Sequence, residues 1–164
     1  METRRFYVDK RFGERNGVRA LSICPLDIDT DKERLECLWA CGDVNAGNTL
    51  AYGIQNDWFE DRNYVRATAI QQLLANRGDV LAMNNLAFSY IHGIGTRKNR
   101  RLAMLWLGKA AKVGFHSAIT NYAYETLFAG NPFGDKELAK LYLQESIEHG
   151  YDDEWKSLYT LRQL

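Results

Sequence analysis

The chain has 164 residues, of which 46% are hydrophobic and 26% are charged, and this composition fits one folded domain and excludes a disordered segment. Lysines and arginines number 21, as do aspartates and glutamates, so the balance excludes a general attraction to nucleic acid or to an anionic membrane. No signal peptide and no apolar window of 18 residues is visible, so we expect a cytoplasmic protein with no membrane partner.

The first 29 residues do not share the pattern of the rest of the chain. Strand-like residues at 6–8 and 18–23, with an Asn-Gly turn at 15–17, predict a small β-hairpin. An irregular segment explains the same residues almost as well. We therefore predict that residues 1–29 form a separate N-terminal segment, either irregular or a β-hairpin.

A capping-box pattern, Thr30-Asp31-Lys32-Glu33, predicts a helix that runs from residue 30 to residue 41. Two of the three cysteines, Cys37 and Cys41, lie four residues apart on this helix, and the third is Cys24. No further Cys or His pair stands near them at the spacing of a zinc site. The simplest interpretation is reduced thiols in the cytoplasm, with Cys37 and Cys41 packed in a core.

From Gly42 onward the sequence matches itself at a shift of 36 residues. Gly42-Asp43-Val44 recurs as Gly78-Asp79-Val80, and the same shift carries Gly78 to Gly114 and to Gly150. Further matches at this shift join Ala67, Ala103 and Ala139, and Ile70, Trp106 and Tyr142. A period of this length is typical of stacked repeats, in which each unit buries its apolar face against its neighbours.

The middle unit, residues 78–113, is predicted to be two amphipathic helices joined by a turn. Apolar residues recur at helical spacing over 81–90 and again over 102–111. The turn between them, residues 92–96, holds Gly93 and Gly95, which accommodate the positive φ that reverses the chain. Trp106 is predicted to lie in the core where two units meet.

Residues 78–114 resemble a Sel-one-like repeat, a relative of the tetratricopeptide repeat. The matching positions are Ala82, Leu86, Tyr90, Gly93, Gly95, Ala103, Trp106, Lys109, Ala110, Ala111 and Gly114. The resemblance implies an all-α fold, a right-handed α-solenoid of stacked helix pairs, in a domain over residues 30–164. It places about three units at 42–77, 78–113 and 114–149, with flanking helices at 30–41 and 152–164. The outer units lack the Gly-x-Gly turn and have other residues at 55–58 and 129–132.

The sequence offers few groups for catalysis. His92, His116 and His149 lie at helix ends, where a role at the helix terminus is favoured over catalysis. Acids and aromatics at residues 57–61 fit either a sugar-binding or acid/base cluster or a cap for the next helix, which we favour. No phosphate-binding glycine loop, dinucleotide fingerprint or nucleophile elbow appears. We therefore expect no enzyme, no catalytic residue, no metal and no cofactor.

Charge is unevenly spread along the chain. Residues 97–112 carry six lysines and arginines and no acid, whereas residues 135–154 carry seven acids against two lysines. The basic run at 97–101 is the one feature that would attract phosphate or nucleic acid. A solvated edge is the favoured interpretation of this run, so no nucleic-acid partner is expected.

A partner-binding surface is predicted on the first helices of successive units, which line the concave side of such arrays. It comprises an aromatic column, an amide and hydroxyl column one turn before it, and a nearby histidine: Tyr52, Phe88 and Tyr124; Asn48, Asn84 and Thr120; and His92. Packing between adjacent helices explains the aromatics equally well. The amides favour binding, because buried amides need hydrogen-bond partners.

These features predict a protein-protein interaction module. The resemblance implies an adaptor or regulator whose groove holds a partner protein. The alternative is an immunity protein that neutralises a bacterial toxin, suggested by the short chain, the lack of a second domain and the separated charges. The sequence does not indicate an oligomeric state.

Overall fold

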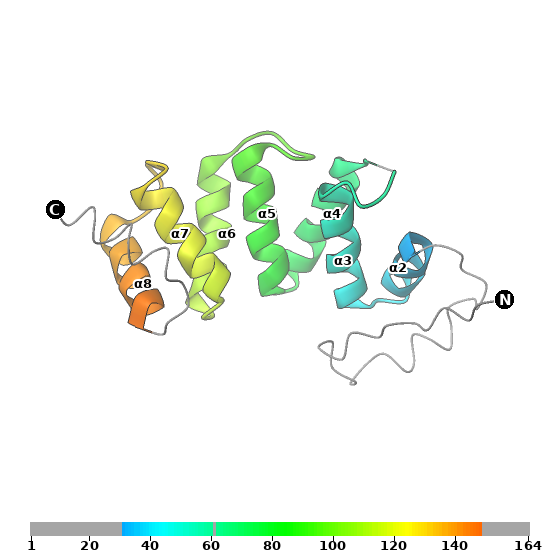
Figure 1. Ribbon diagram of the computed structural model, residues 1–164, viewed down its shortest axis with the longest axis horizontal. Coiled ribbons are helices and arrows are strands. Elements are labelled where there is room, and N and C mark those ends of the chain that lie inside the picture. Colours follow the sequence, from blue (N-terminus) through cyan, green and yellow to red (C-terminus); the bar gives the residue numbers. More distant parts are fainter. Residues whose placement is uncertain (1–30, 61, 149–164) are drawn as a thin grey trace. The chain divides into compact units, whose positions relative to one another are not determined.

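The computed structural model describes residues 31–60 and 62–148, and within these ranges the chain forms helices and turns with no strand. The helices are, in chain order, α2 (Asp31–Ala40), α3 (Val44–Gln55), α4 (Tyr64–Asn76), α5 (Val80–His92), α6 (Arg100–Lys112), α7 (His116–Leu127) and α8 (Lys136–Glu148) (Figure 1). The all-α prediction is confirmed for these residues. The predicted N-terminal segment at 1–29 and the flanking helix at 152–164 lie outside them.

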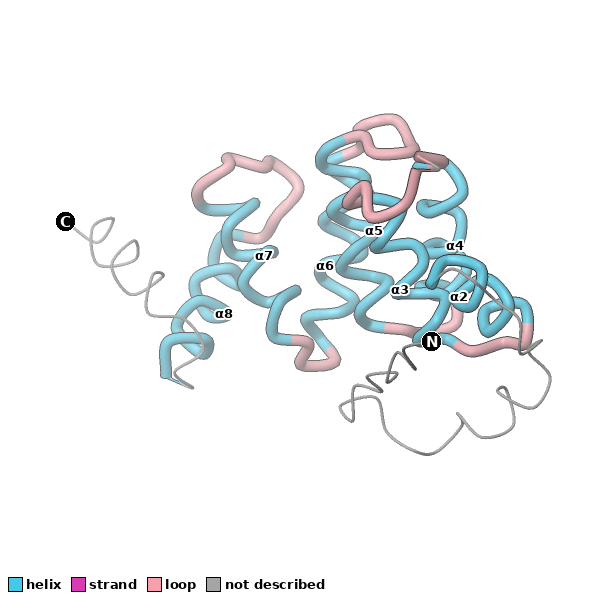
Figure 2. The backbone as a smooth tube through the Cα atoms, turned by 45° about the vertical axis from the view of Figure 1, so that its right-hand side comes forward, coloured by secondary structure: helices cyan, strands magenta, loops and turns pink. Residues whose placement is uncertain are grey.

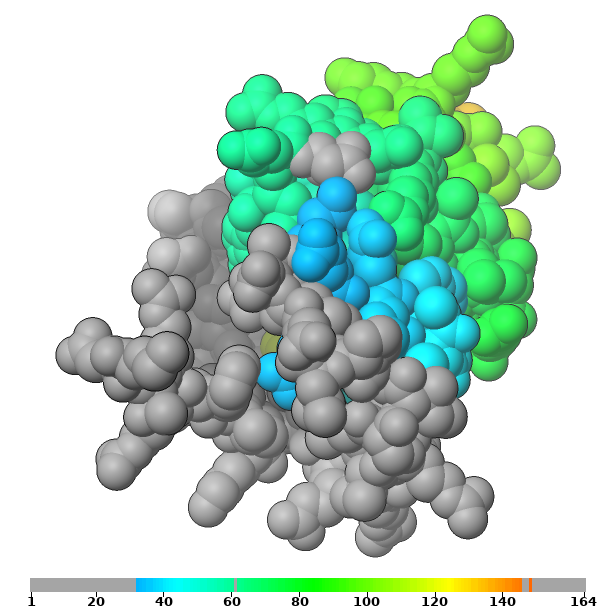
Figure 3. Space-filling model, turned by 90° about the vertical axis from the view of Figure 1, so that its right-hand side faces the viewer, coloured from blue at the N-terminus to red at the C-terminus, as the bar shows by residue number. Residues whose placement is uncertain are grey.

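The chain divides into two compact units between Leu50 and Ala51, within α3. In the first unit the ring of Trp39 lies so close to Gly47 that a Cβ at Gly47 would collide with it. None of the described side chains of α2 is fully buried, and they reach the surface in blue in Figure 3. Cys41 is free, as predicted, but it is exposed, and Cys37 is disulfide-bonded and only partly buried. The prediction of a reduced thiol is therefore wrong for Cys37, and the prediction of core packing is wrong for both.

In the second unit each helix from α4 to α8 packs against the next helix along the chain (Figure 1). Short turns at 77–79 and 113–115 alternate with longer loops at 93–99 and 128–135, and Figure 2 shows the two kinds at opposite ends of the helices. Successive helices are therefore antiparallel neighbours. This is the arrangement expected of stacked helix pairs.

The 36-residue period is visible in the pattern of burial. Ala67, Ala103 and Ala139 are all inaccessible to solvent, so small side chains occupy the closest helix contacts. The aligned large residues Ile70, Trp106 and Tyr142 are also buried, with exposed fractions of 5%, 7% and 8%. The prediction that Trp106 is a core residue is confirmed.

The loop between α5 and α6 depends on glycine at position 95. Gly93 and Gly95 have φ values of +75° and +65°, as the sequence predicts for this turn. A Cβ at Gly95 would collide with the backbone carbonyl of Tyr64, at the start of α4. The Thr68 hydroxyl donates a hydrogen bond to the Ile94 carbonyl at 2.8 Å, so the loop is held against α4. Only glycine fits at position 95 without moving one of these backbones.

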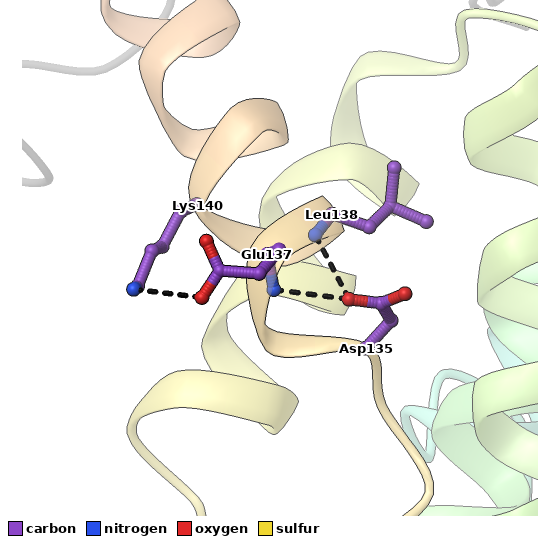
Figure 4. Close-up of polar contacts among 4 residues, drawn as sticks. All are labelled: Asp135, Glu137, Leu138 and Lys140. Atoms are coloured by element: carbon purple, nitrogen blue, oxygen red, sulfur yellow. Dashed lines mark hydrogen bonds and ion pairs between the residues drawn. The ribbon is translucent and has the colours of Figure 1, made fainter.

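Polar side chains cap the starts of several helices. The Asp79 carboxylate accepts a hydrogen bond from the Ala82 amide at 2.7 Å. Asp135 Oδ1 accepts from the amides of Glu137 and Leu138 at 3.0 and 3.1 Å, as Figure 4 shows. These bonds satisfy amides that have no partner inside the helix.

A buried polar cluster joins α3, α4 and α5 in the second unit. Gln55 Nε2 donates to Ser89 Oγ at 2.7 Å, and Gln71 Nε2 donates to Gln55 Oε1 at 2.7 Å. The Ser89 hydroxyl lies 3.0 Å from Gln71 Oε1. Gln71 and Ser89 are fully inaccessible to solvent. Hydrogen bonds among buried polar groups offset the loss of water, and their geometry fixes how the three helices fit together.

Candidate functional site

A pocket of about 190 Å³ lies among α5, α6 and α7, wholly within the second unit. It is lined by Asn84, Phe88, Ile91, His92, Leu107, Asn121, Tyr124 and Glu125. Sites for drug-sized ligands typically measure about 300–1,000 Å³, whereas an apolar cavity of about 150 Å³ holds one benzene ring. The pocket is therefore the size of a single large side chain.

Aromatic rings form much of the exposed part of the pocket lining. Phe88 and Tyr124 are 50% and 44% exposed, although both are large apolar side chains. The Phe88 ring lies 4.2 Å from the His92 ring, centroid to centroid, and the Tyr124 ring stacks on Phe128 at 6.0 Å. Leu107 is only 1% exposed and contributes a buried apolar surface. Rigid rings at the mouth of a pocket are suited to packing against another molecule.

Two amides connect α5 and α7 beside these rings. Asn121 Nδ2 donates to Asn84 Oδ1 at 2.9 Å. Asn84 is partly exposed and Asn121 is exposed. The bond leaves the second N–H of Asn121 and the Nδ2 group of Asn84 as further donors, and each amide oxygen can accept again. The site thus combines aromatic area with directional polar groups.

One carboxylate lines the pocket. Glu125 on α7 is 7% exposed, and its Oε2 atom has no hydrogen-bond donor within reach among the described residues. No lysine or arginine is among the residues that line the pocket. Burying an ionised carboxylate oxygen without a partner costs free energy, so this atom requires an explanation.

Glu125 was not predicted from the sequence, although a signal was present. Glu125 is the only lysine, arginine, aspartate or glutamate between Lys112 and Asp135. A lone acid in an otherwise uncharged helix is typical either of a solvent-exposed position or of a binding or catalytic site. The alternating pattern Tyr-Ala-Tyr-Glu gave no way to tell these two cases apart.

The structure brings four of the seven predicted surface residues together: Asn84, Phe88, His92 and Tyr124 all line the pocket. Thr120 is 8% exposed, and its hydroxyl lies 3.0 Å from the Ser117 carbonyl of its own helix. Asn48, in the first unit, is 6% exposed. Asn48 and Thr120, which the sequence places on the predicted partner-binding surface, are therefore buried in the structure. A hydroxyl can bond to the preceding turn of its helix, so a polar residue at this position need not be exposed.

The remaining predicted aromatic, Tyr52, lies outside the pocket lining. It is 44% exposed, and its ring meets the Trp58 ring edge to face at 5.3 Å. In the same turn Asp57 Oδ1 accepts from the Tyr64 hydroxyl at 2.6 Å and lies 3.4 Å from Arg62 Nε. The hydrogen bond to Asp57 raises the pKa of Tyr64.

The cap of α4 differs from the one that the sequence analysis favoured. Asn63 Oδ1 accepts from the Arg66 amide at 3.0 Å, so the residue that caps α4 is this asparagine and not Asp57 or Glu60. Asp57 bonds to the side chain of Tyr64 instead. The favoured interpretation of this turn was therefore wrong about the capping residue.

The other candidates for chemistry lie apart from the pocket. His116 is the first residue of α7, and His149 lies outside the described residues. The side chains at 97–101 are exposed, and within this run Asn99 caps α6 by accepting from the Leu102 amide at 3.0 Å. Residues 31–60 and 62–148 contain no group of three or more His, Cys, Asp or Glu placed to hold a metal ion. In the same ranges, no helix has the length and apolarity needed to span a membrane.

Comparisons with known proteins bear on the repeat and on the fold. A family model described as the Sel1 repeat matches residues 80–115 and again residues 116–151. These matches begin two residues after the starts predicted for the last two units. A search of curated proteins gave no match.

Two solved structures share the fold. One is a protective antigen present in uropathogenic Escherichia coli strains displaying an SLR fold, with a TM-score of 0.64 and 22% identity over 73% of this chain and 26% of the antigen. The other is a Sel1 repeat protein from Oxalobacter formigenes, with a TM-score of 0.63 and 23% identity over 73% of this chain and 50% of that protein. This chain thus spans about a quarter of the length of the antigen and about half of the length of the Oxalobacter protein. Residues 80–115 and 116–151 thus match two Sel1 repeats, and the two solved structures share the helical-repeat fold of this chain.

Proposed function

We propose that this chain binds a partner protein through the exposed aromatic residues of α5 and α7, Phe88 and Tyr124, and the pocket between them. Sel1 repeats generally mediate protein–protein interaction. The observation that carries the proposal is the exposure of these two rings, 50% and 44%, on the rim of a pocket sized for one side chain. Binding energy in interfaces concentrates at such aromatic anchors and small pockets.

A site-specific photo-crosslinking experiment tests where the partner docks. A photoreactive phenylalanine analogue is placed at position 88 or 124 in the full chain, and at position 105 or 141 as a control. Leu105 and Leu141 are 48% and 59% exposed, but they lie on α6 and α8 and do not line the pocket. We expect one discrete crosslinked partner from positions 88 and 124 only. Crosslinking of that partner from 105 or 141 alone would place the docking surface elsewhere.

Matched truncations then measure the contribution of the rings. Phe88→Ala with Tyr124→Ala should weaken binding of the identified partner by about tenfold or more, since truncating a hot-spot residue costs about 2 kcal/mol. Leu105→Ala with Leu141→Ala removes similar exposed area and should leave affinity within about twofold. Equal losses in the two double variants would contradict the proposal.

The finer role proposed is that of an adaptor or regulator, in which the pocket and the rings select a segment of the partner. Toxin immunity remains the alternative drawn from the sequence. Protection assays distinguish them: an immunity protein rescues cells that express its toxin, and the Phe88→Ala, Tyr124→Ala variant should then lose protection while it accumulates normally. An adaptor restores no growth in such an assay.

A further inference from the structure

We infer that the pocket between α5 and α7 receives an arginine side chain of the partner protein, whose guanidinium binds the Glu125 carboxylate. This inference rests on the proposed function and names the chemical group that the pocket selects. It begins from a comparison of two equivalent places in the repeat.

The 36-residue period aligns the pocket with the buried polar cluster of the preceding unit. Gln55, Gln71 and Ser89 of that cluster correspond to Ile91, Leu107 and Glu125 of the pocket. In the cluster, Ser89 Oγ accepts from Gln55 Nε2 at 2.7 Å, and Gln71 and Ser89 bond to each other at 3.0 Å. The three side chains satisfy one another and fill the space.

One period later the same positions cannot satisfy one another. Ile91 and Leu107 have no side-chain donor, while Glu125 supplies an acidic acceptor in place of a hydroxyl. A pocket of about 190 Å³ remains, and Glu125 Oε2 has no donor within reach among the described residues. No other member of this triplet supplies a donor to Glu125 Oε2. The Nδ2 group of Asn131, a 3% exposed residue whose backbone amide donates to the Glu125 carbonyl at 2.8 Å, also has no hydrogen-bond partner among the described residues and is the competing donor that the variants below must separate from an external one.

The chemistry of the lining specifies the donor. The carboxylate calls for a cation, because charge-assisted hydrogen bonds are shorter and about twice as strong as neutral ones. The rings of Phe88, His92 and Tyr124 favour a planar group that stacks, and Ile91 and Leu107 suit an aliphatic stem. Guanidinium meets all three conditions, whereas an ammonium is a compact and strongly hydrated point charge. The terminal torsion of a glutamate turns easily, so both carboxylate oxygens of Glu125 can be presented to the pocket.

A small-molecule titration tests the inference without the partner. The purified full chain is titrated with N-acetyl-arginine amide and, separately, with the citrulline and lysine equivalents, and the side-chain amide signals of Asn84 and Asn121 are followed by NMR. We expect saturable shifts with the arginine compound in the millimolar range, and affinities at least about tenfold lower for neutral citrulline and for lysine. Equal binding of lysine would overturn the assignment to arginine, and equal binding of citrulline would overturn the role of charge.

Two variants separate a binding role of Glu125 from a structural one. Glu125→Gln should weaken the arginine compound by about tenfold and leave the melting temperature unchanged or higher, while Glu137→Gln, at an exposed acid of α8, changes neither. Leu107→Gln places an amide donor like that of Gln71 in the lining and should weaken binding of the arginine compound, because Glu125 then has a donor within the protein. A lower melting temperature of Glu125→Gln with unchanged affinity would show that the carboxylate serves the fold, for example the turn at Asn131, and would overturn the inference.

The outcomes also separate this inference from the proposed function. If the Phe88→Ala, Tyr124→Ala variant no longer binds the partner but Glu125→Gln binds it with full affinity, the proposed docking surface is supported and the inference that Glu125 binds an arginine is contradicted. If the arginine compound binds but the partner's affinity is unchanged in the Phe88→Ala, Tyr124→Ala variant, the arginine site is supported and the proposed docking surface is contradicted.

Discussion

Gly95 offers a sharp test of how the loop between α5 and α6 is held. Its φ of +65° is strained for any residue with a Cβ, at a cost of about 1–2 kcal/mol. A Cβ there also collides with the Tyr64 carbonyl, a backbone atom that no rotamer change can move. Overpacking of this kind costs about 1–3 kcal/mol more. We therefore expect Gly95→Ala to lower the free energy of unfolding by about 2–5 kcal/mol, a large share of a typical total of about 5–15 kcal/mol.

Gly114→Ala is the matched control. Its φ is +83°, but no atom lies within 4 Å of the position a Cβ would take, so only the backbone strain applies. Alanine also restricts the unfolded chain by about the same amount at both positions, and this effect cancels between the variants. Urea unfolding followed by circular dichroism should show Gly95→Ala less stable than Gly114→Ala by about 1–3 kcal/mol. Equal losses would refute the argument that the loop is packed tightly onto α4.

Three further predictions concern the core, the buried polar cluster and pH. Trp106→Ala should cost about 3–5 kcal/mol in unfolding free energy, measured by urea titration, because the side chain is 7% exposed; a near-normal transition would contradict the repeat packing. Gln71→Ala should lower the free energy of unfolding by about 1–3 kcal/mol, because it leaves Gln55 and Ser89 short of hydrogen-bond partners. If the triple variant Gln55→Ala, Gln71→Ala, Ser89→Ala loses as much stability as the three single variants added together, the three side chains do not act as a cluster. Burial raises the pKa of Tyr142 above 10.0, so its protonated phenol stabilises the fold below that pH and the contribution is lost as pH rises through the raised value; Tyr142→Phe should flatten this alkaline fall in melting temperature.

The features that recur with the period could be predicted from the sequence. Burial of Trp106 and positive φ at Gly93 and Gly95 follow from apolar spacing and from the steric freedom of glycine, which are local properties of each unit. The period also led to three residues of the pocket lining, Asn84, Phe88 and Tyr124, because equivalent positions of successive helices lie side by side in a stack.

The features that depend on contacts among several helices could not be predicted from the sequence. Thr120 was predicted to belong to the partner-binding surface, but it is 8% exposed, and a bond to its own helix lets it be buried. Gln71 is polar in the sequence and fully buried in the structure, because partners on two other helices satisfy it. Glu125 was missed for the converse reason: nothing in its own helix shows that Ile91 and Leu107 cannot supply a donor. Satisfaction of polar groups is a property of three helices together, and no single helix encodes it.

The equivalence between Gln55, Gln71, Ser89 and Ile91, Leu107, Glu125 gives a way to read other arrays of this kind from sequence alone. The three positions follow one another at intervals of 16 and 18 residues, so they can be picked out of any aligned set of repeats. A triplet whose side chains can hydrogen-bond to one another predicts a filled contact that only holds neighbouring helices together. If the pocket binds arginine, a triplet with one acid and two aliphatic residues would predict an open pocket at the equivalent position. After duplication of a repeat, two or three substitutions would then be enough to change a filled contact into an open pocket. The positions of such pockets along an array would determine the spacing of the basic residues that its partner must carry.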